Sequence, residues 1–156
     1  MLHTLTSQIG LIVLVAVCLL ALAKGGPAER FGAVLVAVTW AGLLICQALT
    51  EQTIPEIPLL VSDVVLATGF LLLAVRYASL WLGAGMLFQG AAFTMHLMHM
   101  TEATGHHDHA YVVTVNLLSY AVLATLGGAA LVNWRRRVQA AKLANPPPPP
   151  GPVTGP

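Results

Sequence analysis

The stretch "LLVSDVVLATGFLLLAVRYASLWLGAGMLFQGAAFTMHLMHM", Leu59 to Met100, decides the fold of this chain. A helix that crosses a membrane needs ~20 mostly apolar residues, so this run is about twice as long as one span. Arg76 lies near its middle, in the short break "RYAS", where its charged end can reach the membrane surface. The stretch therefore predicts a tight hairpin of two spanning helices, over residues 59–75 and 80–100.

The composition of the whole chain agrees with a membrane protein. Of the 156 residues, 57% are hydrophobic and only 8% are charged, whereas a soluble domain carries about 25% charged residues. The net charge of +1 gives no field that would attract nucleic acid. We therefore predict an all-α integral membrane protein whose immediate partner is the lipid bilayer.

Three further apolar runs complete a five-helix transmembrane bundle, with spans at about 9–23, 31–48 and 111–132. These runs are continuously apolar and do not alternate as membrane strands would. The spans define one transmembrane domain over residues 1–137. Residues 138–156 are expected to form a flexible, disordered, Pro-rich cytoplasmic tail, because its run of five prolines disfavours helix.

The distribution of charge predicts the orientation of the bundle. With five spans and a cytoplasmic C-terminus, every basic residue falls on the inner side: Lys24, Arg30, Arg76, Arg135, Arg136, Arg137 and Lys142. The six histidines and four of the acidic residues then fall outside, as the bias of cytoplasmic loops toward Lys and Arg requires. The predicted topology is N-out and C-in, and the compact spans lead us to expect a bacterial inner (plasma) membrane.

Four predicted spans each place a polar side chain in the outer leaflet. At 1.5 Å per residue, Gln47, Asp63, His96 and Asn116 lie roughly 6–9 Å below the outer boundary. Helical phase places Gln89 on the face of His96, and Tyr120 on the face of Asn116. Since polar groups at this depth usually face the bundle interior, we expect Gln47, Gln89, Asn116 and Tyr120 to support a site around Asp63.

The segment "MHLMHMTEATGHHDHAY" contains five of the six histidines and suggests a transition-metal site. His96 and His99 are three residues apart and project to one side of a helix, and the following loop adds further imidazoles. The candidate ligands are His96, His99, His106, His107, His109 and Asp63. Imidazole suits zinc or copper, and neighbouring methionines favour copper, but a solvated loop of titrating histidines explains the same residues.

Three functions remain open at this stage. The first is a non-enzymatic membrane protein that binds or senses copper or zinc at its outer face. The second is an accessory subunit of a respiratory, energy-transducing or transport complex, with a polar outer-leaflet site for a quinone or a partner helix. The third is a zinc-dependent hydrolase that uses Asp63, His96 and His99.

Two further expectations concern cofactors and assembly. A b-type haem is disfavoured because no histidine falls in the inner half of any predicted span. Small residues at 83–85 and 127–130 favour close helix packing, either within the chain, in a homo-oligomer or against another subunit.

Overall fold

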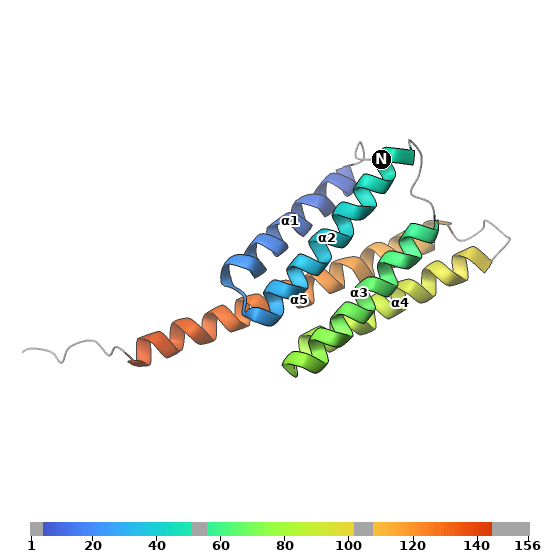
Figure 1. Ribbon diagram of the computed structural model, residues 1–156. Helices are drawn as coiled ribbons and strands as arrows, with labels where there is room; N and C mark the ends of the chain where they lie inside the picture. The colour runs from blue at the N-terminus through green and yellow to red at the C-terminus, as the bar shows by residue number, and fades with distance from the viewer. Residues whose placement is uncertain (1–4, 51–55, 102–107, 145–156) are drawn as a thin grey trace, which may run out of the picture.

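The computed structural model describes residues 5–50, 56–101 and 108–144, and these residues fold into five α-helices joined without a strand. The helices are α1 (Leu5–Lys24), α2 (Pro27–Thr50), α3 (Glu56–Tyr77), α4 (Leu80–Thr101) and α5 (Asp108–Ala144) (Figure 1). The prediction of an all-helical, five-helix chain is confirmed, including the hairpin of α3 and α4 around Arg76.

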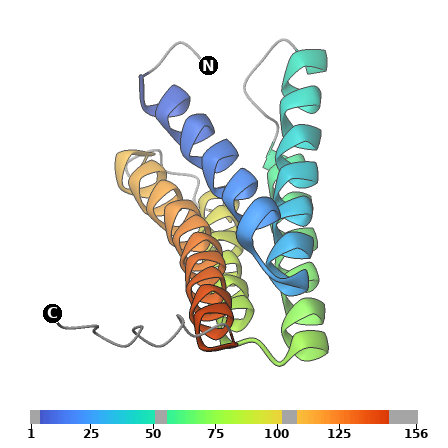
Figure 2. The same cartoon turned by 90° about the vertical axis from the view of Figure 1, so that its left-hand side faces the viewer.

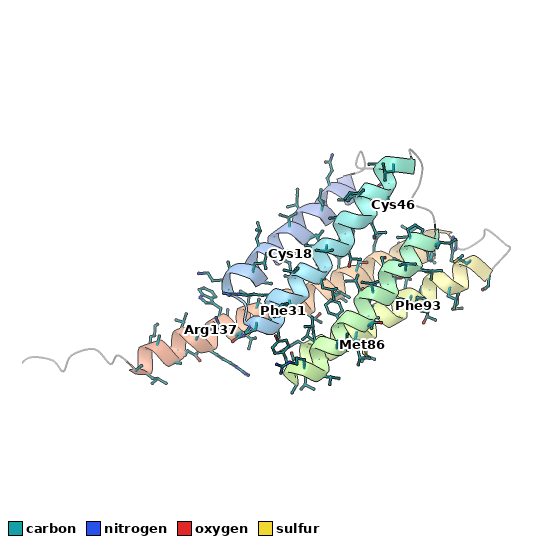
Figure 3. All side chains as sticks on the ribbon, viewed as in Figure 1. Cys18, Phe31, Cys46, Met86, Phe93 and Arg137 are labelled. Atoms are coloured by element: carbon teal, nitrogen blue, oxygen red, sulfur yellow. The ribbon has the colours of Figure 1, made fainter. Side chains whose placement is uncertain are left out.

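The helix α5 runs well past the end of the last predicted span. It continues to Ala144 because the residues after Trp134 are mostly Arg, Gln, Ala, Lys and Leu, all of which favour helix. This part of α5 projects beyond the other four helices, and Arg137 lies on it (Figures 1 and 3). The proline run of the predicted tail lies outside the described residues.

The five helices form a closed ring of neighbours. Each helix packs against the next one in the sequence, and α5 returns to pack against α1, so that the first and last helices lie side by side (Figure 2). A weaker contact joins α2 to α5 across the ring. Residues from all five helices can therefore face a common interior.

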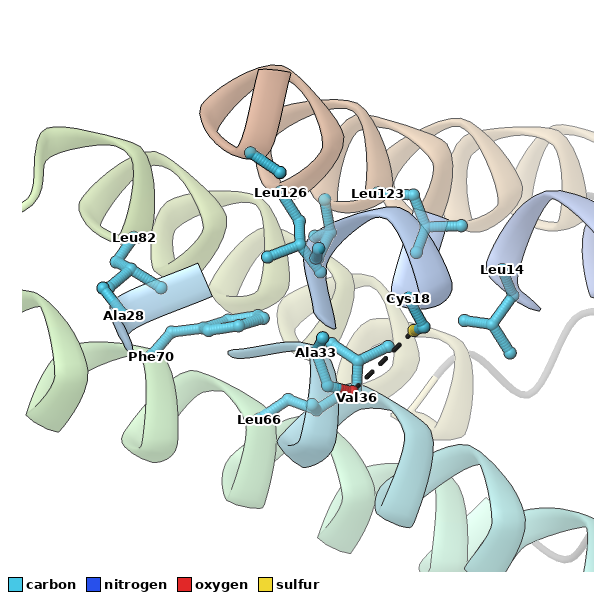
Figure 4. Packing of buried hydrophobic residues seen from close by; sticks show 13 residues of the cluster. Leu14, Cys18, Ala28, Ala33, Val36, Leu66, Phe70, Leu82, Leu123 and Leu126 are labelled. Carbon is cyan, nitrogen blue, oxygen red and sulfur yellow. Dashed lines mark hydrogen bonds between the residues drawn. The ribbon is translucent and has the colours of Figure 1, made fainter. Parts of the chain in front are cut away.

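The apolar core occupies the middle of this ring. Phe70 of α3 is almost fully buried, and its ring atoms lie 3.6–3.7 Å from the position that a Cβ atom on Gly85 would take. The close-up shows Phe70 near Ala28, Leu66 and Leu82 (Figure 4). Cys18 lies in the same cluster and its thiol is directed at the carbonyl oxygen of Ala33, 3.8 Å away, so it packs as a small buried side chain.

The turn between α1 and α2 is stabilised by a side chain from the first turn of α2. The backbone N–H of Gly26 donates a hydrogen bond of 2.8 Å to Oε2 of Glu29, three residues later, which is the capping arrangement expected for a helix N-terminus. Pro27 occupies the first helical position, where its fixed φ fits and its missing N–H has no cost. Asn133 of α5 also donates to Glu29, at 3.3 Å, and ties the turn to α5.

The turn between α3 and α4 ends α3 with a residue in the left-handed region. Ala78 has φ 48°, and the N–H of Ser79 donates to the carbonyl oxygen of Ala74 at 3.3 Å. This six-residue closure is the Schellman motif, in which glycine usually takes the position that Ala78 occupies here.

Three of the described helices are long and apolar enough to cross a membrane. They are α2, α3 and α5, over Pro27–Leu49, Ile57–Tyr77 and Ala110–Ala144, while the apolar part of α1 over Gln8–Lys24 is shorter. Large apolar side chains cover the outside of the ring; Leu72, for example, is 65% exposed and Ile12 is 67% exposed. An apolar exterior of this extent is typical of a surface that faces another apolar phase.

Candidate functional site

Three buried polar side chains meet between α3 and α4, about 10 Å along α3 from its start. Nε2 of Gln89 donates a 2.6 Å hydrogen bond to Oδ1 of Asp63, and Nε2 of His96 lies 3.3 Å from Oδ2. All three residues are at most 7% exposed. This contact brings together two of the predicted metal ligands, Asp63 and His96, and one of the predicted supporting residues, Gln89.

The sequence of α4 explains this meeting. Leu82, Gly85, Gln89, Ala92 and His96 are the buried residues of α4, and they recur every three or four positions along one face. Since Gly85 and Ala92 have small or no side chains, α3 approaches that face closely. Asp63 of α3 then reaches both Gln89 and His96, which lie two helical turns apart.

The carboxyl group of Asp63 has unequal partners at its two oxygens. Oδ1 accepts the hydrogen bond from Gln89, whereas buried Oδ2 accepts no hydrogen bond from the described residues and has only the ion-pair distance to His96. A buried carboxylate without compensation is strongly destabilising in an apolar medium. Among the described residues, His96 is the group at ion-pair distance from Oδ2, which keeps lone pairs that a bound molecule can use.

Tyr111 of α5 completes the cluster and was not singled out by the sequence. Its hydroxyl contacts Nδ1 of His96, and its ring stacks on the ring of His99 with centroids 4.0 Å apart and planes 8° apart. An ionised Asp63 favours the tautomer with the proton on Nε2, so that the Tyr111 hydroxyl donates to Nδ1. Asp63, His96 and Tyr111 thus form a continuous series of titratable side chains from α3 to the first turn of α5.

A cavity of about 240 Å³ adjoins this cluster. Asp63, Gln89 and His96 line it together with Gln47 of α2 and Asn116 of α5, and its remaining walls are mainly apolar side chains from α1, α2, α3 and α5. Asn116 is exposed although it lines the cavity, so the cavity opens at that point of α5. Gln47, Asp63, His96 and Asn116 are the four polar residues that the sequence placed in the outer leaflet, and all four line this cavity.

The fourth predicted supporting residue lies elsewhere. Tyr120 is not among the residues that line the cavity, and its hydroxyl is 3.4 Å from the position of a Cβ atom on Gly10 of α1. Tyr120 therefore packs in the contact between α1 and α5. The sequence around the two tyrosines of α5 does not show which of them contacts His96. The packing of α4 against the first turn of α5 makes Tyr111 that partner.

The described residues hold part of the predicted metal-ligand set. Among them, no group of three or more His, Cys, Asp or Glu side chains converges as metal ligands would. His99 stacks on Tyr111, and both ring nitrogens of His96 already have partners. His106 and His107 lie outside the described residues, as does the side chain of His109, so the six-residue metal site stays a prediction.

Comparison of the chain with protein-family models, curated proteins and solved structures finds no match.

Proposed function

We propose that the chain is an integral membrane protein with five spans, and that its cavity binds the head of a small amphipathic molecule of the quinone class. In this proposal the protein acts as a binding or accessory subunit within a larger membrane complex. The observation that carries the proposal is the cavity beside Asp63 and His96, which joins apolar walls to a few convergent polar groups.

Insertion of all five helices is supported by the closed ring. α1 and α4 have 20 and 22 residues, enough to span ~30 Å, and each packs between two of the three strongly apolar helices. Gln89 and His96 of α4 lie on its buried face, away from lipid. The bacterial inner-membrane location stays a prediction from the sequence.

The size of the cavity supports a head group as its occupant. Sites for whole drug-sized ligands measure roughly 300–1,000 Å³, whereas this cavity has about 240 Å³ and opens beside Asn116. A ring with two oxygen atoms fits such a volume, and an isoprenoid tail can leave toward the lipid. The oxygen atoms of a quinone accept hydrogen bonds and those of a quinol donate them, and Asp63, Gln89 and Asn116 offer both kinds of partner.

Trp40 provides a direct readout of binding because it lines the same cavity. We would purify the full chain with Trp81→Phe and Trp134→Phe, so that Trp40 is its only tryptophan, and titrate a short-chain benzoquinone while following fluorescence quenching. We expect saturable quenching in this protein. Asp63→Asn is expected to weaken binding roughly tenfold, which corresponds to about 1.4 kcal/mol.

The control is Thr94→Val, an exposed position of α4 whose hydroxyl donates to the carbonyl oxygen of Gly90 in its own helix. This variant should bind like the parent. Quenching that does not saturate, or that is the same in Asp63→Asn and in the parent, would remove the quinone proposal.

A transition-metal site is the second candidate, favoured by the Asp63–His96 contact and by the position of His99 one turn further along α4. To bind an ion, a ring nitrogen of His96 must give up its contact with Asp63 or with Tyr111. The same purified protein, titrated with Zn²⁺ or Cu⁺ against a competing chelator, separates the candidates. One tightly bound ion that is lost in the His96→Gln, His99→Gln double variant, together with no saturable quenching, would establish the metal function instead.

A further inference from the structure

A second cavity lies at the opposite end of the bundle from Asp63. It has a volume of about 440 Å³ and lies between the α1–α2 turn, the α3–α4 turn and the segment of α5 around Asn133 and Arg136. Glu29, Tyr77, Ser79 and Trp81 also line it. We call this cavity the basic-end groove, because most of the Lys and Arg residues lie in the turns and helix ends around it.

Arg136 and Glu29 are the charged side chains that line the groove, and in the described residues they are not paired with each other. Arg136 has no carboxylate partner among the described residues, whose ion pairs include only Asp63 with His96. Glu29 is the carboxylate of the groove, and it is already bonded to the N–H of Gly26 and the amide of Asn133. The guanidinium group of Arg136 is therefore available to an anion from outside the chain.

The aromatic residues indicate the depth of the groove in the membrane. Tyr77 and Trp81 are in its wall, and Trp134 lies on α5 close to Lys24, whose ammonium group is 5.4 Å from the Trp134 ring centroid. Trp and Tyr gather at the level of the lipid head groups, and Lys and Arg at the cytoplasmic surface. With the five helices inserted in the membrane as proposed above, the groove lies at the head-group level of the inner leaflet.

We propose that the basic-end groove binds the head group of an anionic phospholipid, with Arg136 as the charged contact to its phosphate. Basic pockets between helices on the cytoplasmic side suit such head groups, and a guanidinium group can make two parallel hydrogen bonds to one phosphate. Leu80 is 90% exposed beside the groove and Trp81 is 48% exposed, so apolar surface is present for the acyl chains. A free phosphate ion would not use that surface.

The test compares one lipid head group with another on the full-length protein in detergent. Phosphatidylglycerol and phosphatidylcholine are added in equal amounts, and the retained lipids are counted by native mass spectrometry. We expect the parent to retain one phosphatidylglycerol in preference to phosphatidylcholine. We expect Arg136→Gln to reduce that retention roughly fivefold, the factor that 1 kcal/mol corresponds to.

Arg135→Gln is the matched control, because it removes the same charge from the neighbouring position, which does not line the groove. It should retain phosphatidylglycerol like the parent, and Arg136→Lys should keep most of the preference. Equal losses in Arg135→Gln and Arg136→Gln would show diffuse charge attraction and overturn the site.

Two further results would also overturn the proposal, and both come from the parent protein alone. Equal retention of the two lipids would show that no anion is needed. Displacement of phosphatidylglycerol by an equal concentration of inorganic phosphate would identify free phosphate as the ligand. Because the lipid test does not involve the Asp63 cavity, its failure leaves the quinone proposal standing, and the reverse also holds.

Discussion

At the scale of single residues, Asp63 is the residue whose surroundings carry most of the functional argument. Its position in an apolar helix identified it from sequence, since a carboxyl group at that depth needs compensation. Helical spacing also placed Gln89, as a supporting residue, and His96, as a candidate ligand, on one face. Tyr111 was missed because its contact with His96 depends on how α4 and α5 pack, which no periodicity within one helix contains.

The hydrogen bond from Gln89 to Asp63 gives a stability prediction. Gln89→Leu removes the donor and leaves Oδ1 of a buried carboxyl group without a partner, which should lower the free energy of unfolding by about 1–3 kcal/mol. Thermal unfolding in detergent measures this loss.

The double variant Asp63→Leu, Gln89→Leu supplies the check, because removing both partners removes the unsatisfied group. It should be more stable than the sum of the two single losses predicts, by roughly 0.5–3 kcal/mol. Strict additivity would mean that the two side chains are not coupled.

At the scale of helices and turns, the sequence predicted the positions of the helices more accurately than their ends. The break "RYAS" was enough to place a hairpin, because one membrane cannot hold so long an apolar run as a single span. It did not reveal the left-handed residue at Ala78, since alanine carries no signal for that conformation. The extension of α5 to Ala144 was also missed, because the span was ended where apolar residues stop, although charged residues continue a helix well.

The conformation of Ala78 gives the second prediction. An L-residue in the left-handed region is destabilised by about 1–2 kcal/mol, and glycine avoids most of this cost. Ala78→Gly should therefore raise the midpoint of thermal unfolding in detergent.

Ala91→Gly is the matched control, because Ala91 is an exposed residue in the middle of α4. Glycine there should lower stability by about 0.5–1 kcal/mol. The same sign of change at both positions would contradict the conformation assigned to Ala78.

At the scale of the whole molecule, the composition and the apolar runs predicted an all-helical protein with five helices. They did not predict which helices pack against each other. The ring closes because α1 and α5 fit together, with Val17 within 3.5 Å of the position that a Cβ atom on Gly127 would take. The small residues at 127–130 were recognised as a packing face, yet the sequence left open whether they meet another helix of this chain or another subunit. The structure places Gly127 against α1 of the same chain.

The orientation of the bundle gives the third prediction. The basic residues lie at the ends of α1 and α3, at the start of α2 and in the last part of α5. The basic-end groove is lined by both turns and by Arg136, so these segments lie at the same end of the bundle. Since Lys and Arg favour the cytoplasmic side, a green fluorescent protein fused after Pro156 should fluoresce in cells.

The complementary fusion uses alkaline phosphatase, which is active only outside the cytoplasm. At the same C-terminal position it should be inactive. An active phosphatase together with a dark fluorescent fusion would reverse the assigned topology, and would move the basic-end groove to the outer leaflet.

On the proposed insertion, the order of the helices in the ring also bears on how the chain enters the bilayer during synthesis. Asp63 and Gln89 belong to consecutive helices joined by a turn of two residues, so their hydrogen bond can form as soon as that pair has left the ribosome. The acid can thereby gain an amide partner before α5 has packed against α4. His96 arrives on the same helix as Gln89, and the phenol of Tyr111 is then added to a carboxyl group that already has neighbours. On the proposed insertion, that acid need not face the hydrocarbon alone once the second of these helices is in place.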